Sequence, residues 1–143
     1  MSNILIDTGF WFALYNKGDQ HYNDAQGLIK HLSIDNIIIP YPTLYETVNT
    51  RFVEKKENFR EFKRLLKQDN FEIIDDAEYK EGLLEQTFDA ALKRGKTYSI
   101  VDKVIRRILD DDTVKIDYLL TFNIGDFVDV CQRRNIRLLW YGS

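Results

Sequence analysis

Cysteines, long apolar runs and a targeting segment are what this chain lacks. Cys131 is the single cysteine among 143 residues, so an internal disulfide framework is excluded. No apolar run approaches the roughly 18–20 residues that a membrane-spanning helix needs. The first residues also lack the basic and apolar regions of a signal peptide. These absences predict a protein of the reducing cytoplasm with no membrane partner.

A surplus of positive charge is missing too, because the formal net charge is −3. This argues against a protein that coats DNA through bulk positive charge, but it does not exclude a nuclease. A cluster of acidic ligands lowers the net charge, and bound divalent cations restore it locally. Zinc is not expected, since His21 and His31 have no Cys or His partner at ligand spacing.

The sequence does contain short apolar runs that alternate with longer segments of helical period, which is typical of an α/β fold with a parallel sheet. Its content of 44% hydrophobic and 30% charged residues is that of a folded domain. No repeat or linker interrupts the pattern, so we expect a single domain over residues 1–143. The expected strands are Ile4–Asp7, Ile37–Pro40, Phe71–Asp75, Tyr118–Phe122 and Ile136–Tyr141.

Apolar residues at helical spacing predict helices in the connections between these strands. The expected stripes are Tyr22, Ala25, Ile29 and Leu32; Leu44, Val48 and Phe52; Phe59, Phe62 and Leu66; Leu84, Phe88, Ala91 and Leu92, ending near Gly95; and Val101, Val104, Ile105 and Ile108.

Strand composition predicts the order of the strands. The first, second and fourth runs are continuously apolar, as in central strands covered on both faces, whereas the third and fifth carry charges that suit an edge. Right-handed crossovers then favour the order 3-2-1-4-5. This order reverses direction between the first and fourth strands, and ligands of open α/β sheets bind beyond the carboxyl ends of the strands at such a point.

Two carboxylates stand at that point. Asp7 ends the first strand, and Asp126 follows the fourth strand by four residues. Converging carboxylates repel one another unless a cation is present. Ligand sets made of oxygen alone suit Mg²⁺ or Mn²⁺, which also bind waters and substrate phosphates.

Both residues also have a structural interpretation. Asp7 could cap a helix that starts at Thr8, because Asp is a favoured N-cap residue. Asp126 could equally cap a short helix over Phe127–Val130. The position of each residue alone leaves these alternatives open.

Two further acids have structural interpretations as well. Ser99 and Asp102 fit a capping box, and Asp102 with Arg106 fits an i,i+4 ion pair. Glu46 lies away from the apolar stripe of its helix, so a solvated helix face explains it.

Taken together, four pieces of sequence resemble one family. Asp7-Thr8 follows an apolar strand, Glu46 lies in a helix after the second strand, Ser99-Ile-Val-Asp102 opens a late helix, and Thr121-Phe-Asn123-Ile-Gly-Asp126-Phe127 follows the fourth strand. In order and approximate spacing they resemble the PIN-domain family, and most closely the VapC-type toxins of toxin–antitoxin pairs. The resemblance runs from Ile4 to about Trp140, and its most specific piece is Thr-x-Asn-x-x-Asp-Phe.

The resemblance implies a Mg²⁺- or Mn²⁺-dependent endoribonuclease that hydrolyses RNA phosphodiester bonds. It further implies a toxin held by an antitoxin protein, and it leaves a homodimer open. The family's acidic quartet maps onto Asp7, Glu46, Asp102 and Asp126, of which Asp7, Asp102 and Asp126 are implied metal ligands and Glu46 orients water or a second metal. The family's polar positions around the metals map onto Thr8, Ser99, Thr121 and Asn123.

Several basic and aromatic residues have two interpretations. Lys103 departs from the family's usual small residue, and it either reaches substrate phosphate or points to solvent. Lys103, Arg106 and Arg107 lie closer to the expected site than other cations, so Lys103 and Arg106 are candidate phosphate contacts. The basic segment Arg51–Lys67 could bind RNA or an acidic partner, or form a solvated helix face. The aromatic group is expected in the core or a dimer surface rather than in a base-stacking platform, and comprises Phe10, Trp11, Phe12 and Tyr15.

Three other functions compete with a nuclease. One is a catalytically inactive PIN-like module that binds RNA or protein, against which the complete acidic quartet counts. Another is a response-regulator receiver, which needs an adjacent acidic pair after its first strand, whereas Asp7 stands alone. A dehalogenase-type phosphatase would need a second Asp at the position of Gly9.

Overall fold

The computed structural model of the chain describes residues 1–48, 55–94 and 98–142. Within these residues one parallel sheet has the order β3-β2-β1-β4-β5, which confirms the predicted order. β1 lies at its centre, with Ile4 opposite Ile37 of β2 and Leu5 opposite Leu119 of β4. The strands are β1 (Asn3–Ile6), β2 (Asn36–Pro40), β3 (Phe71–Ile74), β4 (Tyr118–Leu120) and β5 (Arg137–Leu138).

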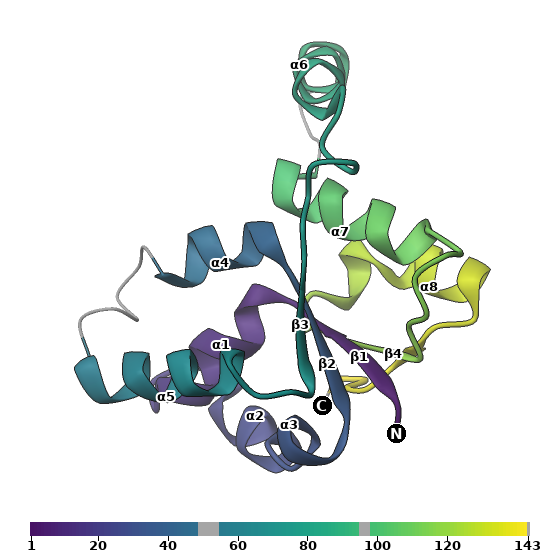
Figure 1. Cartoon of the computed structure of the whole chain (residues 1–143). Coiled ribbons are helices and arrows are strands. Elements are labelled where there is room, and N and C mark those ends of the chain that lie inside the picture. The colour runs from purple at the N-terminus through teal and green to yellow at the C-terminus, as the bar shows by residue number, and fades with distance from the viewer. Residues whose placement is uncertain (49–54, 95–97, 143) are drawn as a thin grey trace.

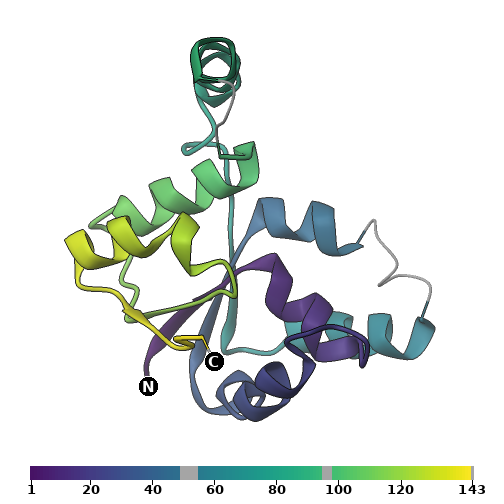
Figure 2. The same ribbon diagram turned by 180° about the vertical axis from the view of Figure 1, so that it is seen from behind.

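Helices cover both faces of this sheet (Figures 1 and 2). The helices α1, α2, α3 and α5 lie on one side, α7 and α8 lie on the other, and α4 lies beyond the carboxyl ends of the strands. None of the described helices combines the length and apolar character needed to cross a membrane. Their bounds are α1 (Thr8–Tyr15), α2 (Tyr22–Leu28), α3 (His31–Ile34), α4 (Tyr41–Val48), α5 (Lys56–Leu66), α6 (Leu83–Arg94), α7 (Ile100–Asp110) and α8 (Val128–Arg134), with a 3₁₀ helix η2 (Ile124–Asp126).

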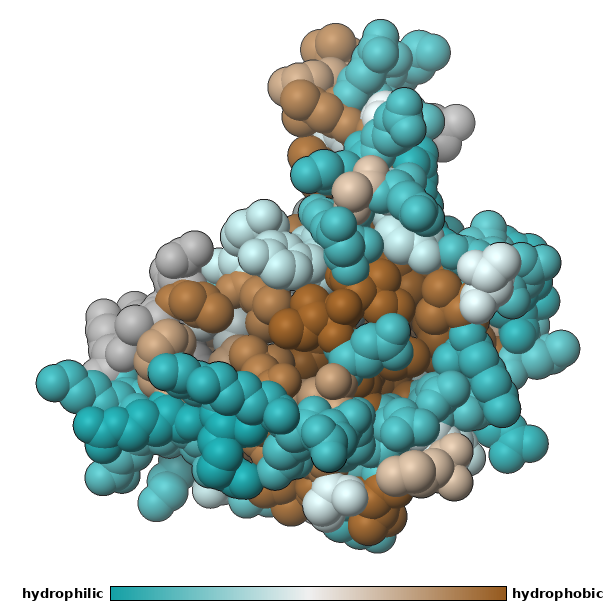
Figure 3. All heavy atoms as spheres, in the orientation of Figure 1, coloured by the Kyte–Doolittle hydropathy of each residue, from teal (hydrophilic) through white to brown (hydrophobic). Residues whose placement is uncertain are grey.

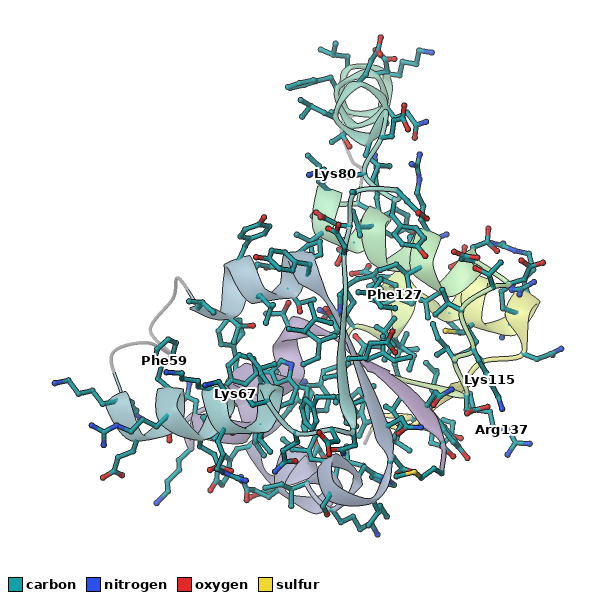
Figure 4. The ribbon with its side chains drawn as sticks, in the orientation of Figure 1. Phe59, Lys67, Lys80, Lys115, Phe127 and Arg137 are labelled. Atoms are coloured by element: carbon teal, nitrogen blue, oxygen red, sulfur yellow. The ribbon has the colours of Figure 1, made fainter. Side chains whose placement is uncertain are left out.

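The apolar strands feed two cores, one on each face of the sheet. Because successive side chains of a strand point to opposite faces, Ile4 and Ile6 enter one core while Leu5 enters the other. Both faces of the central strands are therefore buried, which explains why their sequence shows no alternation. Each fully buried aliphatic side chain contributes about 1.5–3 kcal/mol relative to exposure. Phe127, which is labelled in Figure 4, belongs to the second core, beneath α7 and α8.

The first core also takes the aromatic residues of α1. Phe10 and Trp11 have no exposed surface, and their rings stack with centroids 5.3 Å apart. Phe12 and Tyr15 are partly buried against the same core. The expectation of a core role for these aromatic residues is therefore confirmed.

Two predicted helical stripes were partly wrong. The stripe from Tyr22 to Leu32 is divided between α2 and α3, because the chain turns tightly at Ile29, whose N–H donates to Gln26 O (3.4 Å). Gly27 just before this turn is a weak helix former.

In α4 the predicted stripe covers only part of the buried face. Pro42, Thr43 and Thr47 are buried, Leu44 is partly buried against the first core, and Val48 is half-buried. Threonines can be buried here because their hydroxyls bond to the backbone: Thr43 Oγ1 donates to Pro40 O (2.8 Å) and Thr47 Oγ1 to Thr43 O (2.7 Å). Phe52, which the prediction placed on the same stripe, lies outside the described residues.

The predicted helix near Leu84 exists as α6, but its apolar stripe faces solvent. Leu83 is buried, whereas Leu84, Phe88 and Leu92 are 59%, 61% and 85% exposed. Figures 1 and 2 show why, since α6 projects from the body beyond α7. Gly95, the predicted end of this helix, lies outside the described residues.

Candidate active site at the carboxyl end of the sheet

Asp7 lies where β1 ends beside β4. Its backbone N–H continues the sheet by donating to Leu120 O (3.0 Å), and its side chain is only 6% exposed. One carboxylate oxygen accepts from the N–H of Thr8 (2.8 Å), and the other accepts from Thr121 Oγ1 (3.0 Å). Asp7 is thus the N-cap of α1, as its structural interpretation predicted, and it is also held by the strand next to it.

The pKa of Asp7 is raised to about 6, mainly because burial penalises the charged carboxylate. The negative charges of Asp102 and Glu46 raise this pKa further, while the hydrogen bonds from Thr8 and Thr121 lower it. Asp7 therefore senses two acids that lie 39 and 95 residues away in the sequence.

Glu46 reaches this site from α4. Its Oε1 accepts a hydrogen bond from Thr8 Oγ1 (3.4 Å), although the side chain lies on the exposed side of the helix. Burial raises the pKa of Glu46, the bond from Thr8 lowers it, and the charge of Asp102 raises it.

Asp102 lies in the first turn of α7, and its carboxylate interacts electrostatically with the other three acids. Burial raises the pKa of Asp102, and the charge of Asp126 raises it further, while Ser99 and Arg106 lower it. Ser99 caps α7, because its Oγ accepts from the N–H of Asp102 (3.1 Å). The cap thus uses the backbone of Asp102 and leaves its carboxylate beside the other acids.

Asp126 is carried by the short helix η2 after β4. A chain of hydrogen bonds connects this loop to Asp7: Thr121 Oγ1 donates to Asp7 and accepts from the N–H of Asn123 (3.0 Å), and Asn123 O accepts from the N–H of Asp126 (3.1 Å). The alternative that Asp126 caps the following helix is not realised, since α8 begins after Phe127 without a side-chain cap.

Arg106 holds α7 to this loop. Its guanidinium binds both carboxylate oxygens of Asp129 (2.6 and 2.7 Å), donates to Asp126 O (2.7 Å), and lies over the ring of Tyr98 at 4.7 Å. The predicted ion pair of Arg106 with Asp102 was therefore wrong, because Asp129 offers both oxygens to the planar guanidinium. The bonds from Arg106 lower the pKa of Asp129 to about 2.

Sequence reasoning missed Asp129 and Tyr98. Asp129 lies three residues beyond Asp126, in the first turn of α8, and Tyr98 directly precedes the Ser99 cap. Neither residue belongs to a motif. The packing of α7 on α8 brings Asp129 to Arg106, whereas Tyr98 reaches Arg106 from the segment just before α7.

The other cations near the site have partners within the chain. Lys103 Nζ donates to Thr87 Oγ1 of α6 (2.9 Å), so it neither extends into solvent nor lies free for a phosphate. Arg107 donates to the carbonyl oxygens of Tyr79 and Glu81 (both 2.9 Å). The described part of the basic segment forms α5, where Arg64 binds Glu61, and Arg51 lies outside the described residues.

The donor chemistry of the acids fits a hard divalent cation. Asp7, Glu46, Asp102 and Asp126 offer only carboxylate oxygens, and the pKa values of three of them are raised by another member of the set. Within the described residues, however, no three Asp, Glu, His or Cys side chains lie close enough together to coordinate one metal ion. The acids thus share one electrostatic environment without a closed coordination sphere.

The fold is similar to solved structures of two bacterial proteins. One is VapC20 of Mycobacterium tuberculosis, a sarcin–ricin loop cleaving toxin, with a TM-score of 0.63 and 18% identity over 88% of this chain and 94% of that one. The other is VapBC2 from Rickettsia felis bound to a DNA fragment from their promoter, with a TM-score of 0.58 and 18% identity over 98% of this chain and 99% of that one.

Comparison with curated protein sequences finds no match. The family model of the PIN domain, in contrast, matches residues 4–110, which contain β1 to β3, the helices α1 to α7, and three of the four candidate acids. This match covers most of the chain, and the strand order agrees with it. The chain therefore belongs to the PIN domain family.

Proposed function

We propose that the protein is a divalent-metal-dependent endoribonuclease and the toxin of a toxin–antitoxin pair. The observation that carries the proposal is the position of Asp7, a buried carboxylate where β1 ends beside β4, whose pKa is raised to about 6 by burial and by the charges of Asp102 and Glu46. A fold selected for stability alone would not bury a carboxylate beside two others, whereas a cation site needs such an arrangement. Membership of the PIN family supports the same conclusion.

In this proposal Asp7, Asp102 and Asp126 hold the cation and Glu46 orients water or a second ion. A bound Mg²⁺ or Mn²⁺ supplies an activated water and neutralises charge on the phosphodiester. The chain's own part is to position the carboxylates: the hydroxyls of Thr8 and Thr121 donate to Glu46 and Asp7, Ser99 holds the backbone of Asp102, and Asn123 acts through Thr121.

The substrate in this proposal is RNA, with Lys103 and Arg106 as candidate contacts to its phosphates. Both cations are engaged within the chain, Lys103 with Thr87 and Arg106 with Asp129. A phosphate would have to replace these partners, so we assign the acids the larger role in activity.

The partner is proposed from the named neighbours. VapC20 is a toxin, and VapBC2 was solved on promoter DNA, which supports an antitoxin partner and a place in the cytoplasm for this chain as well. A short reading frame for a DNA-binding protein directly upstream of the gene would support this pairing.

A second candidate function is an inactive PIN-like module that binds RNA or protein. It is favoured by one observation, that the described residues contain no ready group of three metal ligands. The two candidates differ in whether the protein cleaves RNA or only binds RNA or protein.

Incubation of purified protein with RNA tests the proposal. Cleavage should require Mn²⁺ or Mg²⁺, stop in EDTA, and leave 5′-phosphate and 3′-hydroxyl ends, because water rather than the ribose 2′-hydroxyl attacks. Asp7→Asn should lose cleavage by orders of magnitude. The matched control is Asp112→Asn, an exposed carboxylate in the loop after α7, which should cleave normally.

Three outcomes would contradict the proposal. Ends with a 2′,3′-cyclic phosphate, or cleavage that persists in EDTA, would exclude the mechanism. RNA binding by the wild type without any cleavage would favour the inactive module instead.

A further inference from the structure

We propose that a basic hollow between α6, α7 and α8 binds one nucleotide of a single-stranded RNA, with the phosphate against Arg107 and the base on Tyr98. The identity of the ligand rests on the proposed function, in which RNA is the substrate. The hollow has a volume of about 290 Å³. This is near the lower end of the roughly 300–1,000 Å³ of small-ligand sites, so it suits one nucleotide rather than a larger ligand.

Positive charge dominates the wall of this hollow. Its charged side chains are Lys103, Arg106, Arg107, Arg133 and Asp110. Two of the cations are neutralised within the chain, because Arg106 binds Asp129 and Arg133 binds Asp110. The charge of the other two cations decides which ligand the hollow can take.

Lys103 and Arg107 have only neutral acceptors among the residues that the structure describes. Lys103 Nζ donates to a hydroxyl group of α6 (2.9 Å). Arg107 donates to two backbone carbonyl oxygens (both 2.9 Å) and to Gln86 Oε1 (3.4 Å). Hydroxyl, carbonyl and amide oxygens carry no formal charge, so both cations stay uncompensated. An anionic ligand would supply the missing negative charge.

Arg107 can bind a phosphate without leaving its present partners. A guanidinium carries five N–H donors, and the bonds to the two carbonyls and to Gln86 use three of them. The N–H on Nε and one N–H on Nη2 remain, and two neighbouring donors of this kind can bind two oxygens of a phosphate. Lys103 adds its charge to the hollow while it keeps its bond to α6.

Tyr98 gives the hollow an aromatic surface, which a site for a bare anion would not need. Its ring is 39% exposed, and the guanidinium of Arg106 lies 4.7 Å from the ring centroid. Bases of single-stranded RNA stack on aromatic rings and on guanidinium planes. Cations beside such a ring therefore indicate a ligand that combines a phosphate with a base.

The hollow lies next to the acids of the candidate active site. Arg106 lines the hollow and also donates to Asp126 O (2.7 Å), and Lys103 directly follows Asp102 in α7. In Figure 3 hydrophilic side chains cover the side of the projecting α6 opposite its apolar stripe and continue around its base. An RNA strand that crosses the acids can thus place a neighbouring nucleotide in the hollow.

RNA titrations of the full chain test the phosphate contact. The probe is a fluorescein-labelled single-stranded RNA of random sequence, in EDTA so that no RNA is cut. Arg107→Gln should raise the dissociation constant at least about fivefold and reduce the slope of log K against log salt by roughly 0.7, the value for one phosphate contact. Arg107→Lys should bind nearly as well as the wild type, because it keeps the charge. The matched control is Arg137→Gln, which removes an exposed arginine far from α6 in Figure 4 and should change neither quantity.

The same titrations test the base contact. Tyr98→Ala should weaken binding about fivefold or more, whereas Tyr98→Phe should bind normally, because stacking uses the ring and not the hydroxyl. Tyr141→Ala is the control, since Tyr141 is 75% exposed near the end of the chain. A parallel titration with adenosine monophosphate identifies the source of the nucleotide. Binding of adenosine monophosphate alone, lost in Arg107→Gln, would overturn the assignment to RNA.

Equal losses in Arg107→Gln and Arg107→Lys would overturn the phosphate contact, because the bonds to the carbonyls alone would explain them. A wild type that binds neither probe, or RNA binding unchanged in both Arg107→Gln and Tyr98→Ala, would overturn the site. Melting curves show whether each variant is folded, and the Tyr98 pair decides if Arg107→Gln is not. These titrations measure no cleavage, so RNA binding with the expected losses but no cutting in Mn²⁺ would contradict the nuclease alone.

Discussion

At the scale of single residues, Asp7 combines two opposite effects. Its two carboxylate oxygens accept well-placed hydrogen bonds, yet its pKa is raised to about 6 because the charged form is buried beside other acids. The unfavourable effect is larger, so the ionised side chain destabilises the fold. A residue that costs stability where it could be replaced by a neutral amide is typical of a functional site.

This imbalance makes a prediction about pH. Asp7 titrates near 3.8 in the unfolded chain and near 6 in the fold, so the folded state binds more protons between these values and stability falls as the pH rises through them. Asp7→Asn removes this loss, which is up to about 3 kcal/mol for two pKa units. In EDTA the variant should match the wild type at pH 4 and exceed it at pH 8.

Urea unfolding at both pH values measures the difference. Asp112→Asn serves as the control, since an exposed carboxylate should change the free energy of unfolding little at either pH. A variant that is less stable than the wild type at pH 8 would mean that the charge of Asp7 is favourable in the fold.

Asp102 and Ser99 allow helix capping to be separated from activity. The cap of α7 uses the hydroxyl of Ser99 and the backbone N–H of Asp102. Ser99→Ala should therefore cost about 1 kcal/mol of stability. Asp102→Asn keeps the N–H, so it should change stability by less than about 0.5 kcal/mol while cleavage falls by orders of magnitude. Near-normal turnover of Asp102→Asn would remove this residue from the proposed site.

How far the sequence predicts single residues depends on the range of their contacts. The N-cap roles of Asp7 and Ser99 were predicted correctly, because a cap is made within one turn of helix. The partner of Arg106 was predicted wrongly, because Asp129 lies on another helix and nothing local identifies it. The catalytic assignment of the four acids remains a prediction.

At the scale of elements, Arg106 connects α7 to the loop of Asp126 and to α8. Lysine carries its three N–H donors on one nitrogen, so it cannot reproduce the two-nitrogen contact with Asp129 while also donating to Asp126 O. Arg106→Lys should thus lower the free energy of unfolding by about 1–2 kcal/mol and reduce cleavage, because Asp126 loses its support. Chemical denaturation and the RNA assay measure the two effects.

The control for this prediction is Arg133→Lys. Arg133 binds Asp110 with both side chains about half exposed, so the pair should be worth little. If Arg106→Lys is as mild as Arg133→Lys, the guanidinium does not support the loop.

Helices were predicted well as local elements and less well in their packing. The stripe of α6 correctly predicted a helix, since periodicity is a local property. The stripe faces solvent rather than the core, because the helix projects away from the sheet. In α4 the buried face carries threonines whose hydroxyls are satisfied by backbone carbonyls, and hydropathy alone cannot identify such a face.

At the scale of the whole molecule, the sequence predicted the order of the five strands, but the fifth strand, expected over Ile136–Tyr141, is only Arg137–Leu138. Continuous apolar runs identified the central strands and charged runs identified the edges, because each strand's composition reflects how many of its faces are buried. The order places the end of β1 beside β4, which brings Asp7 to the loop of Asp126. Figure 4 shows Lys115 and Arg137 near the N-terminus, far from α6 and Lys80.

The folded state as a whole should respond to the cation that the site is proposed to bind. Binding to the folded state alone contributes about 2.7 kcal/mol at a hundred times the dissociation constant. For a domain of this size that is a rise on the order of 5–10 °C in melting temperature. Wild-type protein should show this rise with millimolar Mn²⁺ relative to EDTA, because a divalent charge relieves the repulsion around Asp7 and Asp102. Asp7→Asn should lose most of the rise, and Asp112→Asn should keep it. A helix cap without a metal role predicts no response in any of the three proteins. Melting curves without a Mn²⁺-dependent shift in the wild type would therefore show that Asp7 is not a ligand, whatever the RNA assay finds.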